Sequence, residues 1–145
     1  MSSIHINGVT DSERTAIETL YRTFNEGNLE LLDNAVVPEW VDTPLAPHQA
    51  PGRDGIKPLI KEFKTAFPDL HIKVHEMIGA AGRVAVRAEI TGTHKGDWFG
   101  VAATGKSFSI AIHEFHYVEN GLITHTWHLE DWFGWFAQVG ASPQG

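Results

Sequence analysis

Apolar residues in the first part of the chain follow the spacing of an amphipathic helix. Between residues 11 and 27 they recur at intervals of three and four, which places them on one helical face. They are Ala16, Ile17, Leu20, Tyr21 and Phe24. Asp11 or Ser12 can cap the start of this helix, and Gly27 can end it in a left-handed conformation.

Two more helical stretches are predicted before residue 68. The first covers residues 29–37 and ends at Pro38, because proline cannot continue a helix. The second covers residues 52–67, with Pro58 in its first turn, where a missing backbone N–H costs little. Three prolines from Pro44 to Pro51 predict an irregular loop between these stretches.

The second half of the chain changes to the alternating pattern of strands. From residue 70 to 75, apolar residues occupy every second position, so one face of the strand is buried and the other is wet. Similar strands are expected over residues 83–92, 107–118 and 122–130, followed by a short helix over residues 132–139. Helices followed by a strongly bent antiparallel sheet indicate an α+β fold in two layers.

Length and composition narrow the class of protein. A chain of 145 residues predicts one domain over residues 1–145, with residues 1–10 as a flexible tail. The formal net charge of −7, without any Lys/Arg run, argues against a nucleic-acid partner. The lack of cysteine excludes disulfides and thiol nucleophiles. Because no apolar run could span a membrane and residues 1–10 do not resemble a secretory signal, we expect a cytoplasmic protein.

Titratable residues concentrate on a predicted hairpin near the end of the chain. Asn120-Gly121 between two β-rich runs is a strong hairpin signal, and four of the nine histidines lie on its strands. Aromatic residues alternate with them, which suggests a partly dry polar site where pKa values can shift. Histidines three residues apart lie on opposite faces of a strand, so no metal site is expected.

The pairing of the hairpin strands depends on the turn. A two-residue loop would place His113 opposite His128, whereas a three-residue loop with a glycine bulge would place Glu114 opposite Thr126 and beside His128. The residues alone leave both registers open.

Six short motifs occur in a recognisable order along the chain, over about residues 12–140. They are Gly52-Arg53-Asp54-Gly55, Ala66-Phe67-Pro68-Asp69-Leu70, Gly92-Thr93-His94-Lys95-Gly96, Thr104-Gly105-Lys106, Asn120-Gly121-Leu122-Ile123, and Trp127 with Asp131. In this order they resemble the SnoaL-like polyketide cyclase family, which is related to scytalone dehydratase, ketosteroid isomerase and nuclear transport factor 2-like proteins.

The resemblance implies a fold and a chemistry. The fold is a cone-shaped α+β barrel, in which a strongly bent, mostly antiparallel sheet wraps around N-terminal helices and encloses one apolar pocket. Members of the family usually form homodimers through the outer faces of their sheets. Characterised cyclases close a ring by intramolecular aldol condensation without a metal or an organic cofactor.

The resemblance also marks candidate catalytic residues. In the family alignment, the last-strand aspartate of characterised cyclases corresponds to His128, and a histidine associated with that site corresponds to Glu114. This alignment favours the register with the three-residue loop and the glycine bulge. Asp131 resembles an aspartate common in uncharacterised relatives. We expect His128 to take the proton α to a carbonyl, oriented by Glu114, while Asp131 protonates or hydrogen-bonds the carbonyl oxygen. The reverse assignment of His128 and Asp131 is the alternative.

Further residues are expected to line the pocket. They are Tyr21, Asp42, His48, Trp98, His113, His116, Trp127 and Trp132. Each group has a simpler alternative: the aromatic residues as core or dimer contacts, His128 at a sheet rim, and Asp131 as the cap of the last helix.

The sequence therefore predicts a cofactor-independent acid–base enzyme of the cyclase, isomerase or hydratase type, acting on a hydrophobic carbonyl compound with a polyketide-like ring system. The alternative is a non-catalytic protein that binds a hydrophobic small molecule in the same pocket. An accessory domain that serves mainly in dimerisation would have no ligand-sized pocket. We expect a hydrophobic ligand and a homodimer, without a nucleic-acid or membrane partner.

Overall fold

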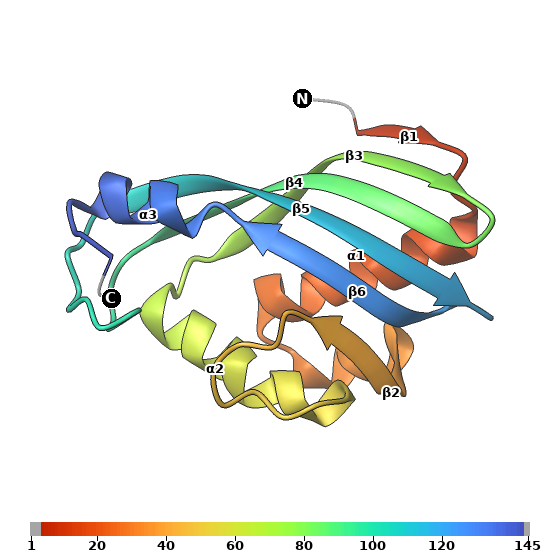
Figure 1. Ribbon diagram of the computed structural model, residues 1–145, viewed down its shortest axis with the longest axis horizontal. Helices are drawn as coiled ribbons and strands as arrows, with labels where there is room; N and C mark the ends of the chain where they lie inside the picture. Colours follow the sequence, from red (N-terminus) through yellow and green to blue (C-terminus); the bar gives the residue numbers. More distant parts are fainter. Residues whose placement is uncertain (1–3, 144–145) are drawn as a thin grey trace.

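The computed structural model describes residues 4–143, in which one curved sheet covers a layer of helices (Figure 1). The six strands have the order β1-β3-β4-β5-β6-β2. Strands β3 to β6 form an antiparallel meander, and the edge strands β1 and β2 run parallel to β3 and β6. The elements are β1 (His5–Asn7), α1 (Asp11–Glu26), the 3-10 helix η1 (Leu29–Asn34), β2 (Val36–Thr43), the 3-10 helix η2 (Arg53–Ile56), α2 (Lys57–Ala66), β3 (His71–Ala80), β4 (Arg83–Thr93), β5 (Ser107–Glu119), β6 (Leu122–Glu130) and α3 (Trp132–Val139). The predicted α+β fold is confirmed.

Helix α1 begins at a capping box, one residue earlier than the sequence analysis placed its cap. The Thr10 hydroxyl accepts a hydrogen bond from Glu13 N at 3.2 Å, and the Glu13 carboxylate accepts one from Thr10 N at 2.9 Å. Asp11 and Ser12 therefore lie in the first turn, because Thr10 is the residue with an extended backbone. Gly27 ends the helix at φ 67°, as predicted.

Both edge strands use segments for which the sequence predicted other structures. His5–Asn7 pairs with β3, so this part of the expected flexible tail is a strand, and residues 1–3 lie outside the described residues. The helical stretch expected over residues 29–37 ends at Asn34, and Pro38 lies inside β2. Proline is tolerated there because β2 is an edge strand, where one side of the backbone has no partner strand.

The β5–β6 hairpin combines a two-residue loop with a bulge on its second strand. Both residues of the Asn120-Gly121 loop have positive φ, 50° and 78°, as a type I′ turn requires. Thr124 has no partner residue on β5, so every pair beyond it is shifted by one. Glu114 therefore lies directly opposite His128, and both registers considered from the sequence are wrong.

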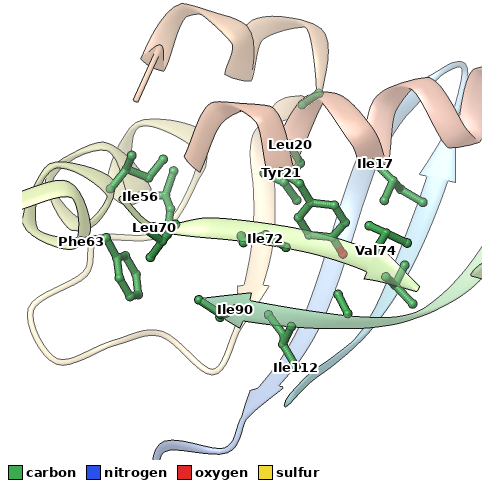
Figure 2. Packing of buried hydrophobic residues seen from close by; sticks show 14 of the residues in the cluster. Ile17, Leu20, Tyr21, Ile56, Phe63, Leu70, Ile72, Val74, Ile90 and Ile112 are labelled. Atoms are coloured by element: carbon green, nitrogen blue, oxygen red, sulfur yellow. The ribbon is translucent and has the colours of Figure 1, made fainter. Parts of the chain in front are cut away.

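The core lies between the inner face of the sheet and the helices (Figure 2). Alternate residues of the central strands, such as Ile90 and Ile112, point toward α1 and α2, where Ile17 and Phe63 pack with them in one cluster. The helix predicted over residues 52–67 is a 3-10 turn followed by α2. Within residues 4–143, no helix is long and apolar enough to cross a membrane.

Candidate active site

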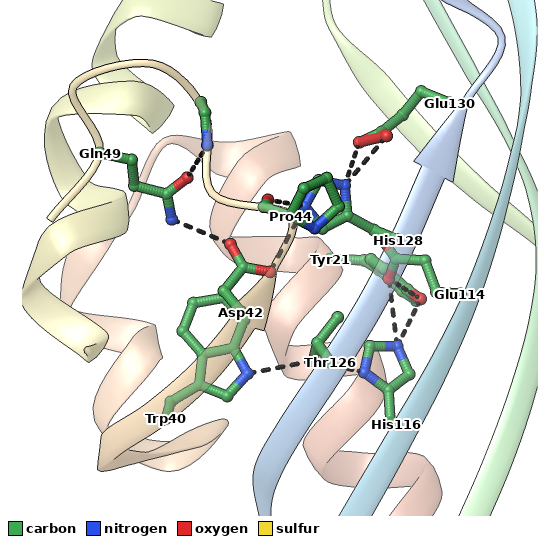
Figure 3. A network of polar contacts seen from close by, with 11 residues as sticks. Tyr21, Trp40, Asp42, Pro44, Gln49, Glu114, His116, Thr126, His128 and Glu130 are labelled. Atoms are coloured by element: carbon green, nitrogen blue, oxygen red, sulfur yellow. Dashed lines mark hydrogen bonds and ion pairs between the residues drawn. The ribbon is translucent and has the colours of Figure 1, made fainter. Parts of the chain in front are cut away.

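A cavity of about 620 Å³ remains between the inner face of the sheet, helices α1 and α2, and the loop that follows β2. Its wall is largely apolar, and its aromatic residues include Phe24, Phe63, Trp98, Phe99 and Trp132. Polar side chains from α1, β2, β5 and β6 gather in one network, drawn in Figure 3. Those that line the cavity include Tyr21, Asp42, Gln49, Glu114, Thr126, His128 and Glu130. A cavity of this size and character suits an organic ligand of moderate size.

His128 makes hydrogen bonds that require a proton on both ring nitrogens. Nδ1 lies 2.7 Å from Glu130 Oε1, and Nε2 lies 2.7 Å from the Pro44 carbonyl oxygen. Both partners only accept hydrogen bonds, so the ring is an imidazolium. Burial favours the neutral ring, but the hydrogen bond and charge of Glu130, with the charges of Asp42 and Glu114, raise the pKa of His128 to about 9.

Asp42 stands beside His128 near the end of β2. Its Oδ1 lies 3.6 Å from His128 Nε2, and its Oδ2 accepts a hydrogen bond from Gln49 Nε2 at 2.9 Å. The carboxyl group is buried, and burial raises the pKa of Asp42 above its ordinary value although Gln49 and His128 act in the opposite direction. Gln49 is held in turn by a hydrogen bond from Ala46 N at 2.9 Å. The loop after β2 therefore fixes the acid.

Glu114 projects from β5 into the same network. Its Oε1 accepts a hydrogen bond from the Tyr21 hydroxyl at 2.7 Å and lies 3.1 Å from His116 Nε2. Burial disfavours the charged carboxylate, but these contacts outweigh it and lower the pKa of Glu114. The same burial, together with the charge of Glu114, raises the pKa of Tyr21 well above its ordinary value. Glu114 is therefore an anion and Tyr21 a neutral donor.

Behind Glu114, the hydrogen bonds continue into the core. His116 Nδ1 lies 2.8 Å from Thr126 Oγ1, which accepts a hydrogen bond from Trp40 Nε1 at 3.0 Å. With Trp40 donating to Thr126, the threonine hydroxyl can donate to His116 Nδ1, and His116 Nε2–H then points at Glu114. His116, Thr126 and Trp40 are all buried, so this row of donors holds the Glu114 carboxylate in place.

The sequence matches the family described as SnoaL-like polyketide cyclase over residues 14–139. This chain belongs to that family. TsrD from Streptomyces laurentii has a similar structure, with a TM-score of 0.82 and 25% identity, covering 90% of this chain and 96% of that chain. IdmH from Streptomyces antibioticus, a candidate polyketide cyclase, gives a TM-score of 0.78 and 28% identity, covering 91% of this chain and 100% of that chain.

Proteins of different description share this SnoaL-like fold. AclR from Streptomyces galilaeus, a candidate hydroxylase, has a TM-score of 0.75 and 23% identity, covering 91% of this chain and 83% of that chain. A comparison with curated proteins finds no match. Because one fold can host several reactions, the residues of this chain's own cavity, and not the fold, determine its chemistry.

The structure brings most of the expected site residues of this SnoaL-like chain together. His128, Glu114, Tyr21 and Asp42 line the cavity with the two aromatic residues Trp98 and Trp132. His116 is fully buried one layer behind Glu114 and contacts it directly. Glu114 was expected to orient His128, but its hydrogen bonds go to Tyr21 and His116, and Glu130 bonds the His128 ring.

Four expected site residues lie elsewhere. His113 and Trp127 are on the outer face of the sheet, because strand alternation and the bulge direct their neighbours Glu114 and His128 inward. His48 is exposed on the loop after β2, where Gln49 takes the inward position. Asp131 is exposed and caps α3, accepting a hydrogen bond from Gly134 N at 2.9 Å. Its side chain does not line the cavity, so the expected role of Asp131 in the pocket was wrong.

Four residues of the network had no assigned role in the sequence analysis: Glu130, Gln49, Thr126 and Trp40. Glu130 lies two residues after His128 on the same strand face, and this spacing is a signal that could have identified it. Thr126 and Trp40 carry no such signal, because their hydrogen bond joins segments far apart in the chain. Gln49 is close to Asp42 in the chain, but its contact depends on the conformation of the loop after β2. Within residues 4–143, no group of three or more His, Asp or Glu side chains has an arrangement suited to a metal ion.

Proposed function

We propose that this SnoaL-like protein is a cofactor-independent acid–base enzyme of the cyclase or isomerase type, acting on a hydrophobic carbonyl compound in the cavity. The observation that carries the proposal is the juxtaposition of His128 and Asp42, whose facing atoms are 3.6 Å apart on the cavity wall. One group can donate a proton and the other can accept one, and enolisation of a carbonyl compound needs both.

His128 is the proposed proton donor to the carbonyl oxygen. A pKa of about 9 keeps the ring protonated at neutral pH, which makes it a poor base and reverses the role favoured from the sequence. Glu130 holds the ring through Nδ1, so Nε2–H is the proton available to a substrate. In the free protein this proton is shared with the Pro44 carbonyl oxygen, which a substrate oxygen would replace.

Asp42 is the proposed proton acceptor. Its raised pKa makes it a stronger base than an exposed aspartate, and Gln49 orients it through Oδ2, leaving Oδ1 directed at His128. Removal of the α proton by Asp42, with donation from His128, gives an enol. The enol carbon then attacks a second carbonyl group of the substrate, Asp42 gives its proton to the new alkoxide oxygen, and His128 recovers its proton from the enol hydroxyl as the first carbonyl re-forms. The sequence involves no net redox change and needs no cofactor.

The experiment that tests this proposal does not require the natural substrate. The protein is incubated with 2-tetralone in D₂O, and exchange of the α protons is followed by NMR. We expect exchange above the buffer rate, and a reduction of about 10²- to 10⁴-fold in His128→Gln and in Asp42→Asn. Asp131→Asn is the matched control, because Asp131 lies outside the cavity and asparagine preserves the cap.

The same experiment separates an enzyme from a binding protein. Tetralone that binds with an unchanged exchange rate would refute the acid–base proposal and favour ligand storage. Equal exchange rates in the wild type and both cavity variants would also refute it.

We also propose that the protein is a homodimer. The motivating observation is an apolar outer face on β5 and β6, where Phe115, Trp127 and Leu129 are 60%, 36% and 74% exposed. Contiguous exposed apolar residues of this kind mark association surfaces. The family resemblance supports pairing through this face.

A further inference from the structure

The cavity has an uneven charge balance. Five carboxyl groups line it, from Asp42, Glu62, Asp97, Glu114 and Glu130. Within residues 4–143, the cavity wall includes neither Lys nor Arg, and its single cationic side chain is His128. His128 contacts Glu130 and Asp42, so the carboxylates of Glu62, Asp97 and Glu114 have no cationic partner on the cavity wall among the described residues. An anionic ligand would meet repulsion here, without a guanidinium or ammonium group to bind it.

Two of these carboxylates stand at the outer end of the cavity. Glu62 is on α2, and Asp97 is on the connection between β4 and β5, which is bound to the end of α2 through the hydrogen bond from Gly96 N to Ala66 O at 3.1 Å. Both side chains are exposed, and neither has an ion-pair or hydrogen-bond partner among the described residues. They are therefore available to a ligand that enters the cavity.

The wall next to these two acids is aromatic. Trp98 follows Asp97 in the chain and packs against Phe63, with ring centroids 4.6 Å apart, and Trp132 lies 5.8 Å from Trp98. Aromatic faces attract cations, and they do so more strongly where water is partly excluded. A hydrophobic ring body that carries a cation fits this combination of aromatic wall and free carboxylates.

Glu114 gives a second indication at the inner end of the cavity. The side chain is 8% exposed and lines the cavity, and both of its contacts within the described residues use Oε1. Its other oxygen, Oε2, has no hydrogen-bond partner among those residues. Because Glu114 lines the cavity, this free oxygen can accept a hydrogen bond from a donor on a ligand.

We propose that the ligand of this cavity is a hydrophobic ring compound that bears a protonated amine and no anionic group, with the amine between Glu62 and Asp97. This proposal rests on the acid–base function proposed above and specifies its substrate class. Carboxylated and phosphorylated compounds are poor ligands on the same grounds.

Three probes with the same ring body but different charge test the proposal by isothermal titration calorimetry. They are 1-naphthylmethylamine, 1-naphthylmethanol and 1-naphthylacetate. We expect the amine to bind about tenfold more tightly than the alcohol, since it gains exposed ion pairs and a cation–π contact, and the carboxylate to bind most weakly. Added salt should weaken the binding of the amine more than that of the alcohol.

A double variant tests whether Glu62 and Asp97 cause the preference for the amine. Glu62→Gln with Asp97→Asn should bring the affinity for the amine to within about twofold of the affinity for the alcohol. The affinity for the alcohol should not change. The control carries the same charge change outside the cavity, Glu39→Gln with Glu119→Gln, and should behave as the wild type.

Equal binding of all three probes, tighter binding of the carboxylate, or no binding of the amine at millimolar concentration would overturn the proposal. An unchanged preference for the amine in the double variant would overturn the assignment to Glu62 and Asp97. The probes have no carbonyl group, so these results do not depend on turnover. Loss of tetralone exchange with the amine preference retained would instead count against the acid–base function alone.

Discussion

Replacing His128 by glutamine should change how the stability of the protein depends on pH. The imidazolium is held by Glu130 and lies beside Asp42, so the folded state binds the His128 proton more tightly than the unfolded chain does. Glutamine keeps a polar side chain but has no titratable proton. The difference in stability between wild type and His128→Gln therefore isolates the titration of this one group.

The magnitude follows from the two pKa values. The folded-state pKa of His128 is about 9, against 6.5 for a free histidine side chain, and each pH unit of that difference corresponds to about 1.4 kcal/mol. His128 should thus contribute about 3 kcal/mol to the free energy of unfolding. Because the folded pKa is raised, this contribution is complete below pH 6.5, declines between pH 6.5 and about 9, and is absent above that.

Urea unfolding of both proteins between pH 6 and pH 9.5 measures this contribution. We expect the free-energy difference between wild type and His128→Gln to shrink by about 3 kcal/mol across that range. NMR titration of the His128 ring gives an independent measure and should show a midpoint near 9. A difference that stays constant with pH, or a ring that titrates near 6.5, would refute the imidazolium and with it the donor role.

Three further predictions concern other parts of the structure. Asp131→Ala should lower the free energy of unfolding by about 1 kcal/mol through loss of the α3 cap, with tetralone exchange unchanged; a large loss of exchange would return Asp131 to the site. Thr126→Val should cost about 1–3 kcal/mol in chemical denaturation, because Trp40 and His116 lose a buried partner, and Thr126→Ser should restore most of it. Leu129→Asp on the outer sheet face should convert a dimer into single chains in sedimentation experiments, and wild-type protein that sediments as one chain would refute the dimer.

The parts of the fold that depend on local pattern were predictable from the sequence. The helix over residues 11–26 and the strands from residue 71 to residue 130 follow from periodicity, because each buries one face against the core. The hairpin register was not predictable. Ile123 N donates a hydrogen bond at 2.8 Å to the carbonyl oxygen of Ala35, just before β2, and the bulge at Thr124 directly follows this distant contact. A prediction made from the turn residues alone could not include this contact.

The residues of the candidate site also divide into those that the sequence predicted and those that it did not. The family resemblance marked His128 and Glu114, on a predicted strand pair rich in titratable residues, and the observed register places them opposite each other. The expected role of Asp131 was wrong because its carboxylate caps α3, where it accepts a hydrogen bond from Gly134 N. Gln49 reaches the site through the conformation of a proline-rich loop, for which the sequence gives no pattern.

The charge arrangement supports the proposal that His128, which the family resemblance aligns with an aspartate, can take part in acid–base chemistry. An aspartate on the last strand would be the proton acceptor, and a histidine held by a carboxylate becomes a donor instead. The proposed acceptor then comes from the neighbouring strand, where β2 supplies Asp42 with Oδ1 3.6 Å from His128 Nε2. Glu130 contributes most to this division of roles, because its hydrogen bond and charge are the main effects that raise the pKa of His128 against burial. In this proposal, the identity of residue 130 therefore helps to decide which of the two neighbouring side chains is the acid and which is the base.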